Sequence, residues 1–131
     1  MKIKNIVPKD KADVEFINGL CKYGIDEVRE VVPTLLASLQ DGNWPCAGPV
    51  ADYLAKHTNE IYKEILNVLR GNDETWKYWV VKFLVLHSEV IPNSKIMQVV
   101  ERIAYSPTKP EKIEEVDEIA LEVIDKYKPV D

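Results

Sequence analysis

The residues best suited to binding chemistry gather in two short segments that have the composition of turns. Their carboxylate and amide groups could bind polar or cationic groups, and their tryptophan rings could anchor an apolar contact. The candidate partner-binding residues are Asp41, Asn43, Trp44, Asn72, Asp73, Trp76 and Lys77. Taken singly, each has a more common structural role, because Asn and Asp at turns cap helices and tryptophans wedge between neighbouring helices. A binding patch is therefore one of two interpretations.

His57 and His87 lie thirty positions apart, at equivalent places near the ends of two expected helices. An imidazole at such a place can meet unpaired carbonyl groups, so we expect capping roles for both. A zinc site would need further ligands at coordinating spacing, and the sequence has neither an HExxH motif nor a CxxC pair. We therefore expect no metal ion and no other cofactor.

The two cysteines, Cys21 and Cys46, lie far apart and beside apolar or small residues, which is typical of buried thiols in a reducing compartment. A cysteine nucleophile would need a histidine close to it in space, and neither cysteine has flanking basic residues that would activate it. The five glycines are scattered singly, so they form no phosphate-binding loop. No catalytic constellation is complete, and we expect a protein that is not an enzyme.

Composition and charge limit the class of protein. The 131 residues, 46% of them hydrophobic, predict a single domain over residues 1–131. A net charge of -5 argues against nucleic-acid and anionic-membrane binding, because phosphate groups need clustered Lys and Arg. No stretch approaches the roughly 20 apolar residues that span a bilayer. We expect a cytoplasmic protein whose acidic balance favours a basic partner.

A thirty-residue repeat is the strongest architectural signal. Helix pairs of this period cannot bury their apolar faces alone, so they stack on neighbouring pairs and present an extended surface. The repeat predicts an all-α stack of about seven helices. Each residue of a first set has a similar residue thirty positions later. The first set is Leu35, Leu36, Leu39, Val50, Ala51, Tyr53, Leu54 and His57, and the second set, in the same order, is Ile65, Leu66, Leu69, Val80, Val81, Phe83, Leu84 and His87.

Hydrophobic periodicity and helix-breaking residues predict the individual helices. Asp26, Asn43 and Ser94 are expected N-caps, and Pro33 must bend or divide the second helix. Residues 71–73 should close the fourth helix and cap the fifth, which is apolar nearly all round and therefore belongs in the middle. The expected helices cover residues 11–23, 25–40, 45–57, 58–70, 74–87, 94–105 and 110–127.

The last expected helix has an apolar face and an acidic face. The acidic face is typical of the solvated end of a stack, although it could also recognise a basic partner by its charge. The apolar stripe comprises Ile113, Val116, Ile119, Ala120, Val123 and Ile124. The acidic residues are Glu111, Glu114, Glu115, Asp117, Glu118, Glu122 and Asp125.

Several motifs carry a resemblance to known proteins. The segment VVPTLL at residues 31–36, with a proline inside the first helix of a pair, resembles the bent first helix of HEAT repeats. The segments PKDK at 8–11, LQDGNWP at 39–45, LRGNDETWKYW at 69–79 and EEVDEIA at 114–120 resemble a small bacterial family of unknown function. The resemblance implies a HEAT-like α-α superhelix, and it implies no activity and no catalytic residue.

These observations favour a non-enzymatic module that binds a protein or peptide, for which a toxin-neutralising immunity protein is one example. The alternative is a small-molecule binder or enzyme that uses a groove between helices, lined by Trp44, Trp76 and Tyr78. A third interpretation is a purely structural subunit that associates with itself through an apolar patch. The sequence leaves the oligomeric state open.

Overall fold

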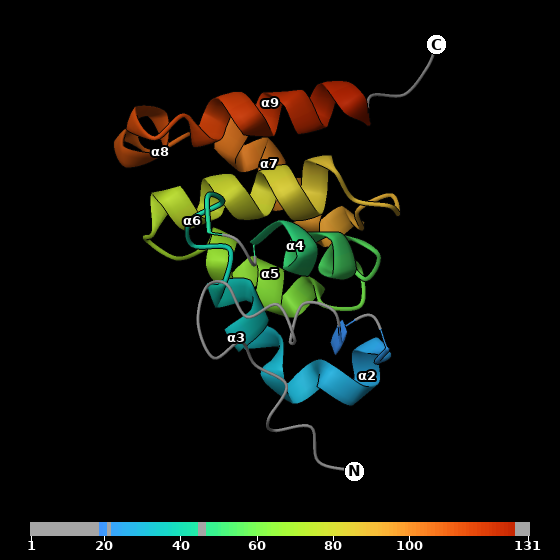
Figure 1. Ribbon diagram of the computed structural model, residues 1–131. Helices are drawn as coiled ribbons and strands as arrows, with labels where there is room; N and C mark the ends of the chain where they lie inside the picture. The colour runs from blue at the N-terminus through green and yellow to red at the C-terminus, as the bar shows by residue number, and fades with distance from the viewer. Residues whose placement is uncertain (1–18, 21, 45–46, 128–131) are drawn as a thin grey trace.

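The computed structural model describes residues 19–20, 22–44 and 47–127, and every regular element in these ranges is helical. The elements, in chain order, are α2 (Ile25–Val28), η1 (Arg29–Val31), α3 (Val32–Ala37), α4 (Ala47–Ala55), α5 (Tyr62–Leu69), α6 (Glu74–Val80), η2 (Val81–Leu86), α7 (Ser94–Tyr105), α8 (Lys109–Ile113) and α9 (Val116–Lys126). They form a stack that runs from α2 at one end to α9 at the other (Figure 1). The all-α prediction is confirmed for the described part of the chain.

A proline divides the first helical run, as predicted. The short helix α2 and the 3-10 helix η1 come first, and Pro33 then stands in the first turn of α3, where its missing N–H matters little. The predicted cap is wrong. Gly24 is the N-cap of α2, and its N–H donates to Glu27 Oε1 at 2.9 Å. Asp26 lies inside the helix and pairs with Arg29 at 3.3 Å.

The helix α5 begins later than predicted, because residue 58 lies in a turn that runs from 56 to 61. Thr58 is fully buried in that turn. Its Oγ1 donates to the Leu84 carbonyl at 2.8 Å and accepts from Ser88 Oγ at 3.0 Å. Threonine hydroxyls compete with helix formation by such bonds, and this one joins the turn to η2.

The continuous run of α6 and η2 covers the predicted fifth helix and lies in the middle of the stack (Figure 1). It packs against α4, α5 and α9. Its central side chains, Val80, Val81, Leu84 and Val85, have no exposed surface. The central position predicted from its composition is confirmed, whereas its second half is a π-helix that the sequence analysis did not anticipate.

The C-terminal region differs from prediction in its caps and in one break. Asn93, not Ser94, caps α7, since its Oδ1 accepts the N–H of Ile96 at 3.0 Å. The expected helix over 110–127 is two helices, because the chain turns at Glu115, which has a left-handed φ of 61°. The break exposes Ile113 by 68%, although the sequence analysis placed it on the apolar stripe.

Several sequence predictions lie outside the described residues. Of the expected helix over 11–23, only residues 19–20 and 22–23 are described. Residues 19–20 are helical, with Leu20 in the core, and residues 22–23 form a turn. Cys21 and Cys46 are outside the described ranges. Because α4 begins at Ala47, the residue directly before it is Cys46, and the expected cap Asn43 lies three residues further back. Among the helices that are described, none combines the length and the apolar composition needed to cross a membrane.

Two glycines provide a matched test of the packing. A Cβ on Gly42 would lie 2.5 Å from the Trp79 ring, whereas a Cβ on Gly48 in α4 would meet nothing within 4 Å. We expect Gly42→Ala to lower the free energy of unfolding by about 1–3 kcal/mol through overpacking. Gly48→Ala should change it by less than about 1 kcal/mol, because the better helix propensity of alanine is opposed by the crowding of its Cβ against the ring of Pro49, the next residue. Urea denaturation of both variants checks this, and equal effects would contradict the described contact.

Candidate partner-binding site

The two predicted turns contact the same helix, α6, at different positions along its axis. In the first turn (residues 41–44), Asp41 Oδ1 accepts the N–H of Asn43 at 2.8 Å, and Gly42 lies against Trp79 of α6. The second turn (residues 72–75) starts α6, and Asp73 caps it by accepting the N–H of Trp76 at 3.1 Å. This cap was predicted. Residues 73 and 79 are about 9 Å apart along the helix axis, at 1.5 Å per residue.

Both candidate tryptophans pack against the core. The indole Nε1 of Trp76 donates to the Leu36 carbonyl at 2.8 Å, which ties α6 to the end of α3. Trp44 also packs against core residues. Each tryptophan is only partly buried and keeps some accessible surface. The predicted wedging role fits Trp76, which joins α6 to α3.

Lys77 lies in the interior and not on the turn surface. Its side chain is 5% exposed, and its Nζ lies 2.6 Å from Glu74 Oε1 and 3.0 Å from Glu111 Oε2. Because two carboxylates enclose the ammonium group, it presents no charge to a partner. The prediction that Lys77 belongs to the partner-binding surface is therefore wrong.

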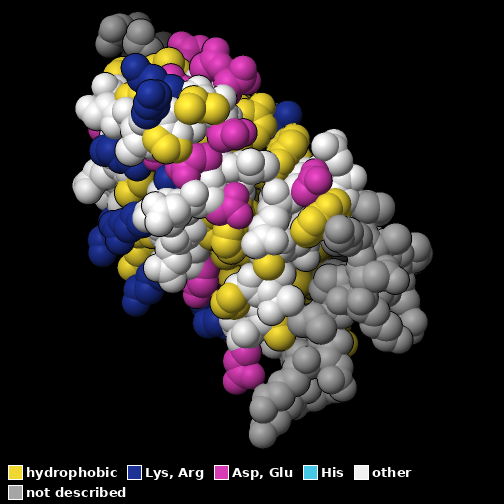
Figure 2. Space-filling model, turned by 90° about the vertical axis from the view of Figure 1, so that its left-hand side faces the viewer, with side chains coloured by type: hydrophobic (Ala, Val, Ile, Leu, Met, Phe, Trp, Pro, Cys, Tyr) yellow, Lys and Arg dark blue, Asp and Glu magenta, His cyan; other side chains and the backbone are white. Residues whose placement is uncertain are grey.

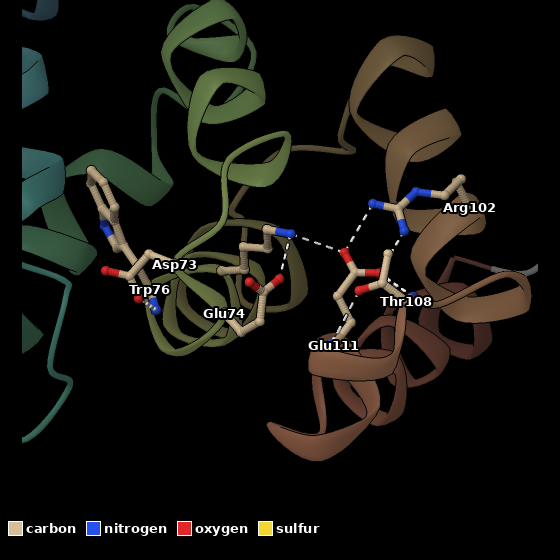
Figure 3. A network of polar contacts seen from close by, with 7 residues as sticks. Asp73, Glu74, Trp76, Arg102, Thr108 and Glu111 are labelled. Carbon is tan, nitrogen blue, oxygen red and sulfur yellow. Dashed lines mark hydrogen bonds and ion pairs between the residues drawn. The ribbon is translucent and has the colours of Figure 1, made fainter.

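A fully buried carboxylate, that of Glu111, is the centre of a buried ionic cluster (Figure 3). We define this cluster as Glu74, Lys77, Arg102 and Glu111. The Arg102 guanidinium donates to both carboxylate oxygens, at 2.5 Å to Oε1 and 2.9 Å to Oε2. The backbone N–H of Thr108 donates to Oε1 at 2.8 Å as part of the capping box of α8. The cluster thus joins α6, α7 and α8, and its two positive and two negative groups balance.

Hydrogen bonding keeps Glu111 ionised although it is buried. Desolvation alone would raise its pKa, but hydrogen bonds from Arg102, the Thr108 backbone and Lys77 outweigh it and lower the pKa to about 2. The hydrogen bond to Glu111 in turn raises the pKa of Arg102. Glu111 was predicted to lie on a solvated acidic face. That prediction is wrong, because the break at Glu115 turns α8 so that this residue points inward.

A groove of about 650 Å³ opens between the second turn and α8, and we call it the α6–α8 groove. Of the predicted candidates it brings together Asn72 and Asp73, and it does not include the first turn or Trp76. Figure 2 views the molecule from the side of α8 and the second turn, where acidic and hydrophobic side chains are interleaved. The groove is lined by Asn72, Asp73, Glu74, Thr75, Pro110, Ile113 and Glu114.

Both histidines lie at helix ends, as predicted. His87 follows η2, and its backbone N–H donates to the Lys82 carbonyl at 3.2 Å. His57 follows α4, and its Nδ1 lies 2.9 Å from Glu60 Oε1, so its ring contacts a side chain instead of helix carbonyls. Within the three described ranges, no three His, Cys, Asp or Glu side chains are grouped so that they could hold a metal ion.

The sequence analysis missed Arg102, Thr108 and the role of Glu111. One local signal was available, because Thr108 and Glu111 have the spacing of a capping box, with a proline in the first helical turn. The partner Lys77 lies 34 residues from Glu111 in the sequence, and nothing local indicates that pairing. Only the fold brings these groups together.

Removing the central charge tests the buried ionic cluster. We expect Glu111→Gln to lower the free energy of unfolding by about 1–3 kcal/mol, because it removes the carboxylate that Lys77 and Arg102 share, while Lys77 keeps Glu74 and the Arg102 side chain is 41% exposed to water. Glu118→Gln, on the exposed face of α9, is the matched control and should change stability by less than about 0.5 kcal/mol. Urea denaturation at neutral pH measures both variants, and a similar small effect at the two positions would contradict a structural role for the cluster.

The difference in the free energy of unfolding between wild type and Glu111→Gln should depend on pH. The pKa of Glu111 is about 2 in the folded protein and about 4.5 ordinarily, so its contribution is complete above pH 4.5 and is lost as the pH falls toward 2. The difference in stability between wild type and Glu111→Gln should therefore shrink across that window. Urea denaturation repeated at several pH values measures it. A difference that stays constant would show that the charge of Glu111 contributes nothing.

One comparison with known proteins gives a match, and it covers nearly the whole chain. No curated protein matches it. A family model described as a domain of unknown function, DUF5071, matches residues 6–124. This agrees with the resemblance to a family of unknown function drawn from the motifs. The chain belongs to the DUF5071 family.

Proposed function

We propose that this protein is a non-enzymatic interaction module that binds a basic segment of a partner protein in the α6–α8 groove. The observation that carries the proposal is Ile113, an isoleucine 68% exposed beside carboxylates in a groove of about 650 Å³. A large exposed apolar side chain with a charged rim is typical of a contact surface. The groove therefore fits a segment that offers both an apolar side chain and positive charge.

The charges around the groove favour a cation. Among the described residues, Asp73, Glu74 and Glu114 line it and no lysine or arginine does. Because Glu74 is already paired with Lys77, the net negative charge of the lining comes from Asp73 and Glu114. On the face shown in Figure 2, most Lys and Arg side chains lie toward the left-hand edge, and some of them lie beside acidic ones. The net charge of -5 adds long-range attraction for a basic partner and repels nucleic acid. These rim charges would act mainly on the rate of association and on specificity.

The buried ionic cluster supports a groove that is formed before binding. Glu74 lines one wall and also pairs with Lys77, which in turn pairs with Glu111 of α8. The other wall consists of Pro110, Ile113 and Glu114 on and beside α8. Because ion pairs fix the two walls relative to each other, a partner would not need to order them, and that lowers the entropic cost of association.

We also propose that the stack of helices is a HEAT-like α-α superhelix. The proline that divides the first helical run and the stack of helices in Figure 1 support a HEAT-like α-α superhelix. An immunity-type inhibitor, acting in the cytoplasm of a bacterium, would fit an acidic module of this kind. The alternative function, a small-molecule binder that uses a groove between helices, is supported by a separate pocket beside Trp76.

Titration with model peptides tests the proposed groove. We expect a short peptide of alternating lysine and leucine to shift the amide NMR signals of residues 72–75, 109 and 111–114. Its glutamate and leucine counterpart should leave them unchanged. Glu114→Lys, on the rim, should weaken binding of the basic peptide about tenfold, or about 1.4 kcal/mol. Glu118→Lys, which is exposed on α9 outside the groove, is the control for net charge. Equal weakening by both variants, or shifts elsewhere, would contradict this site.

A further inference from the structure

A second, smaller pocket lies beside Trp76, where α3, α5 and the start of α6 meet. Its volume is about 160 Å³, and it shares no lining residue with the α6–α8 groove. Four of the six described residues that line it are apolar. The six residues are Pro33, Leu36, Glu64, Asn67, Val68 and Trp76.

Packing fixes the apolar walls of this pocket before any ligand binds. Leu36 and Val68 belong to the core and are 2% and 6% exposed. Trp76 is partly buried, and its indole Nε1 donates to the Leu36 carbonyl at 2.8 Å, which ties the ring to α3. Because the indole has a single N–H, this bond leaves it no donor for a ligand. The ring of Trp76 therefore offers a ligand only aromatic contact.

We propose that this pocket binds a neutral ligand with a single aromatic ring. The ring would contact Leu36 and Val68, and Trp76 supplies an aromatic wall, against which another aromatic ring packs better than a saturated group does. An anion is disfavoured, because the charged residue among the described lining is Glu64, a carboxylate. A mainly apolar lining with few polar groups is typical of sites for small molecules.

The volume fits one ring. An apolar cavity of ~150 Å³ is large enough to hold benzene, and this pocket has about 160 Å³. The shared chemistry is one uncharged aromatic ring, which a free aromatic molecule or an aromatic side chain of a peptide can supply. This inference goes beyond the proposed function and is independent of the α6–α8 groove, since either site can fail without the other.

Small probes test the pocket in the wild-type protein by NMR. The readouts are the signal of the Trp76 indole N–H, assigned with Trp76→Phe, and the amide signals of Leu36, Asn67 and Val68. Phenol should shift these signals and saturate, with a dissociation constant on the order of 1 mM. Cyclohexanol, a saturated ring of the same size, should bind about three- to tenfold more weakly, because it lacks the aromatic contact. Benzoate, as an anion, should bind at least about tenfold more weakly.

N-acetyl-tyrosine amide distinguishes the two sources of the ring. Binding of phenol alone assigns the pocket to a free aromatic molecule, and this would support the small-molecule alternative. Binding of N-acetyl-tyrosine amide as well assigns it to an aromatic side chain of a peptide. Either result supports the aromatic site. Cyclohexanol or benzoate binding as tightly as phenol, or no saturable shift with phenol, would overturn it.

Filling the pocket with a protein side chain tests its location. We expect Val68→Phe to abolish saturable phenol binding, because the added ring would occupy the proposed site. Lys63→Phe introduces the same side chain at an exposed position of α5 outside the pocket, and it should leave phenol binding unchanged. A Val68→Phe protein that is folded by circular dichroism and binds phenol as the wild type does would overturn the assignment.

A second measurement needs no variant in the pocket and so does not depend on whether Val68→Phe folds. In the wild type, protons of bound phenol should give intermolecular NOEs to the Trp76 ring and to the methyl groups of Leu36 and Val68. NOEs to these groups support the site. Their absence at saturating phenol, or NOEs confined to other residues, would overturn it.

Discussion

One fully buried carboxylate constrains the C-terminal half of this stack. Glu111 lies at the start of a short helix that would have few contacts of its own, and an unpaired charge there would be costly. Arg102 from α7, Lys77 from α6 and the backbone of Thr108 all donate to it. Because each donor comes from a different place in the chain, satisfying this one charge fixes how three helices lie against each other.

The α6–α8 groove, the proposed binding surface, depends on that arrangement. The start of α6 stands between two hollows, the α6–α8 groove on one side and the pocket beside Trp76 on the other. Lys77 holds the wall of the groove formed by α8, and the bond from Trp76 to the Leu36 carbonyl holds the wall of the pocket formed by α3. The same short helix therefore positions both, through an ion pair in one direction and an indole hydrogen bond in the other.

Some features that depend only on neighbouring residues could be predicted from the sequence, although the caps of α2 and α7 were placed wrongly, and features that depend on distant residues could not. Pro33 divides its helix and Asp73 caps the next, because both effects act within one turn. Lys77 and Glu111 were misplaced on the surface, since their pairing spans 34 residues and resembles ordinary surface charge in the sequence. The exposure of Ile113 was missed for a related reason, because the periodicity of 110–127 continues through the break after α8.

Amide hydrogen exchange at neutral pH tests the central claim, that the charge of Glu111 holds α8 in place. The reporters are the N–H groups of Lys112 and Glu114, which donate to the carbonyls of Thr108 and Pro110. In Glu111→Gln these two amides should exchange much faster than in wild type, while buried amides of α4 and α5 change only as far as global stability requires. Unchanged protection in α8 would show that apolar packing alone positions this helix, and that the buried charge does not.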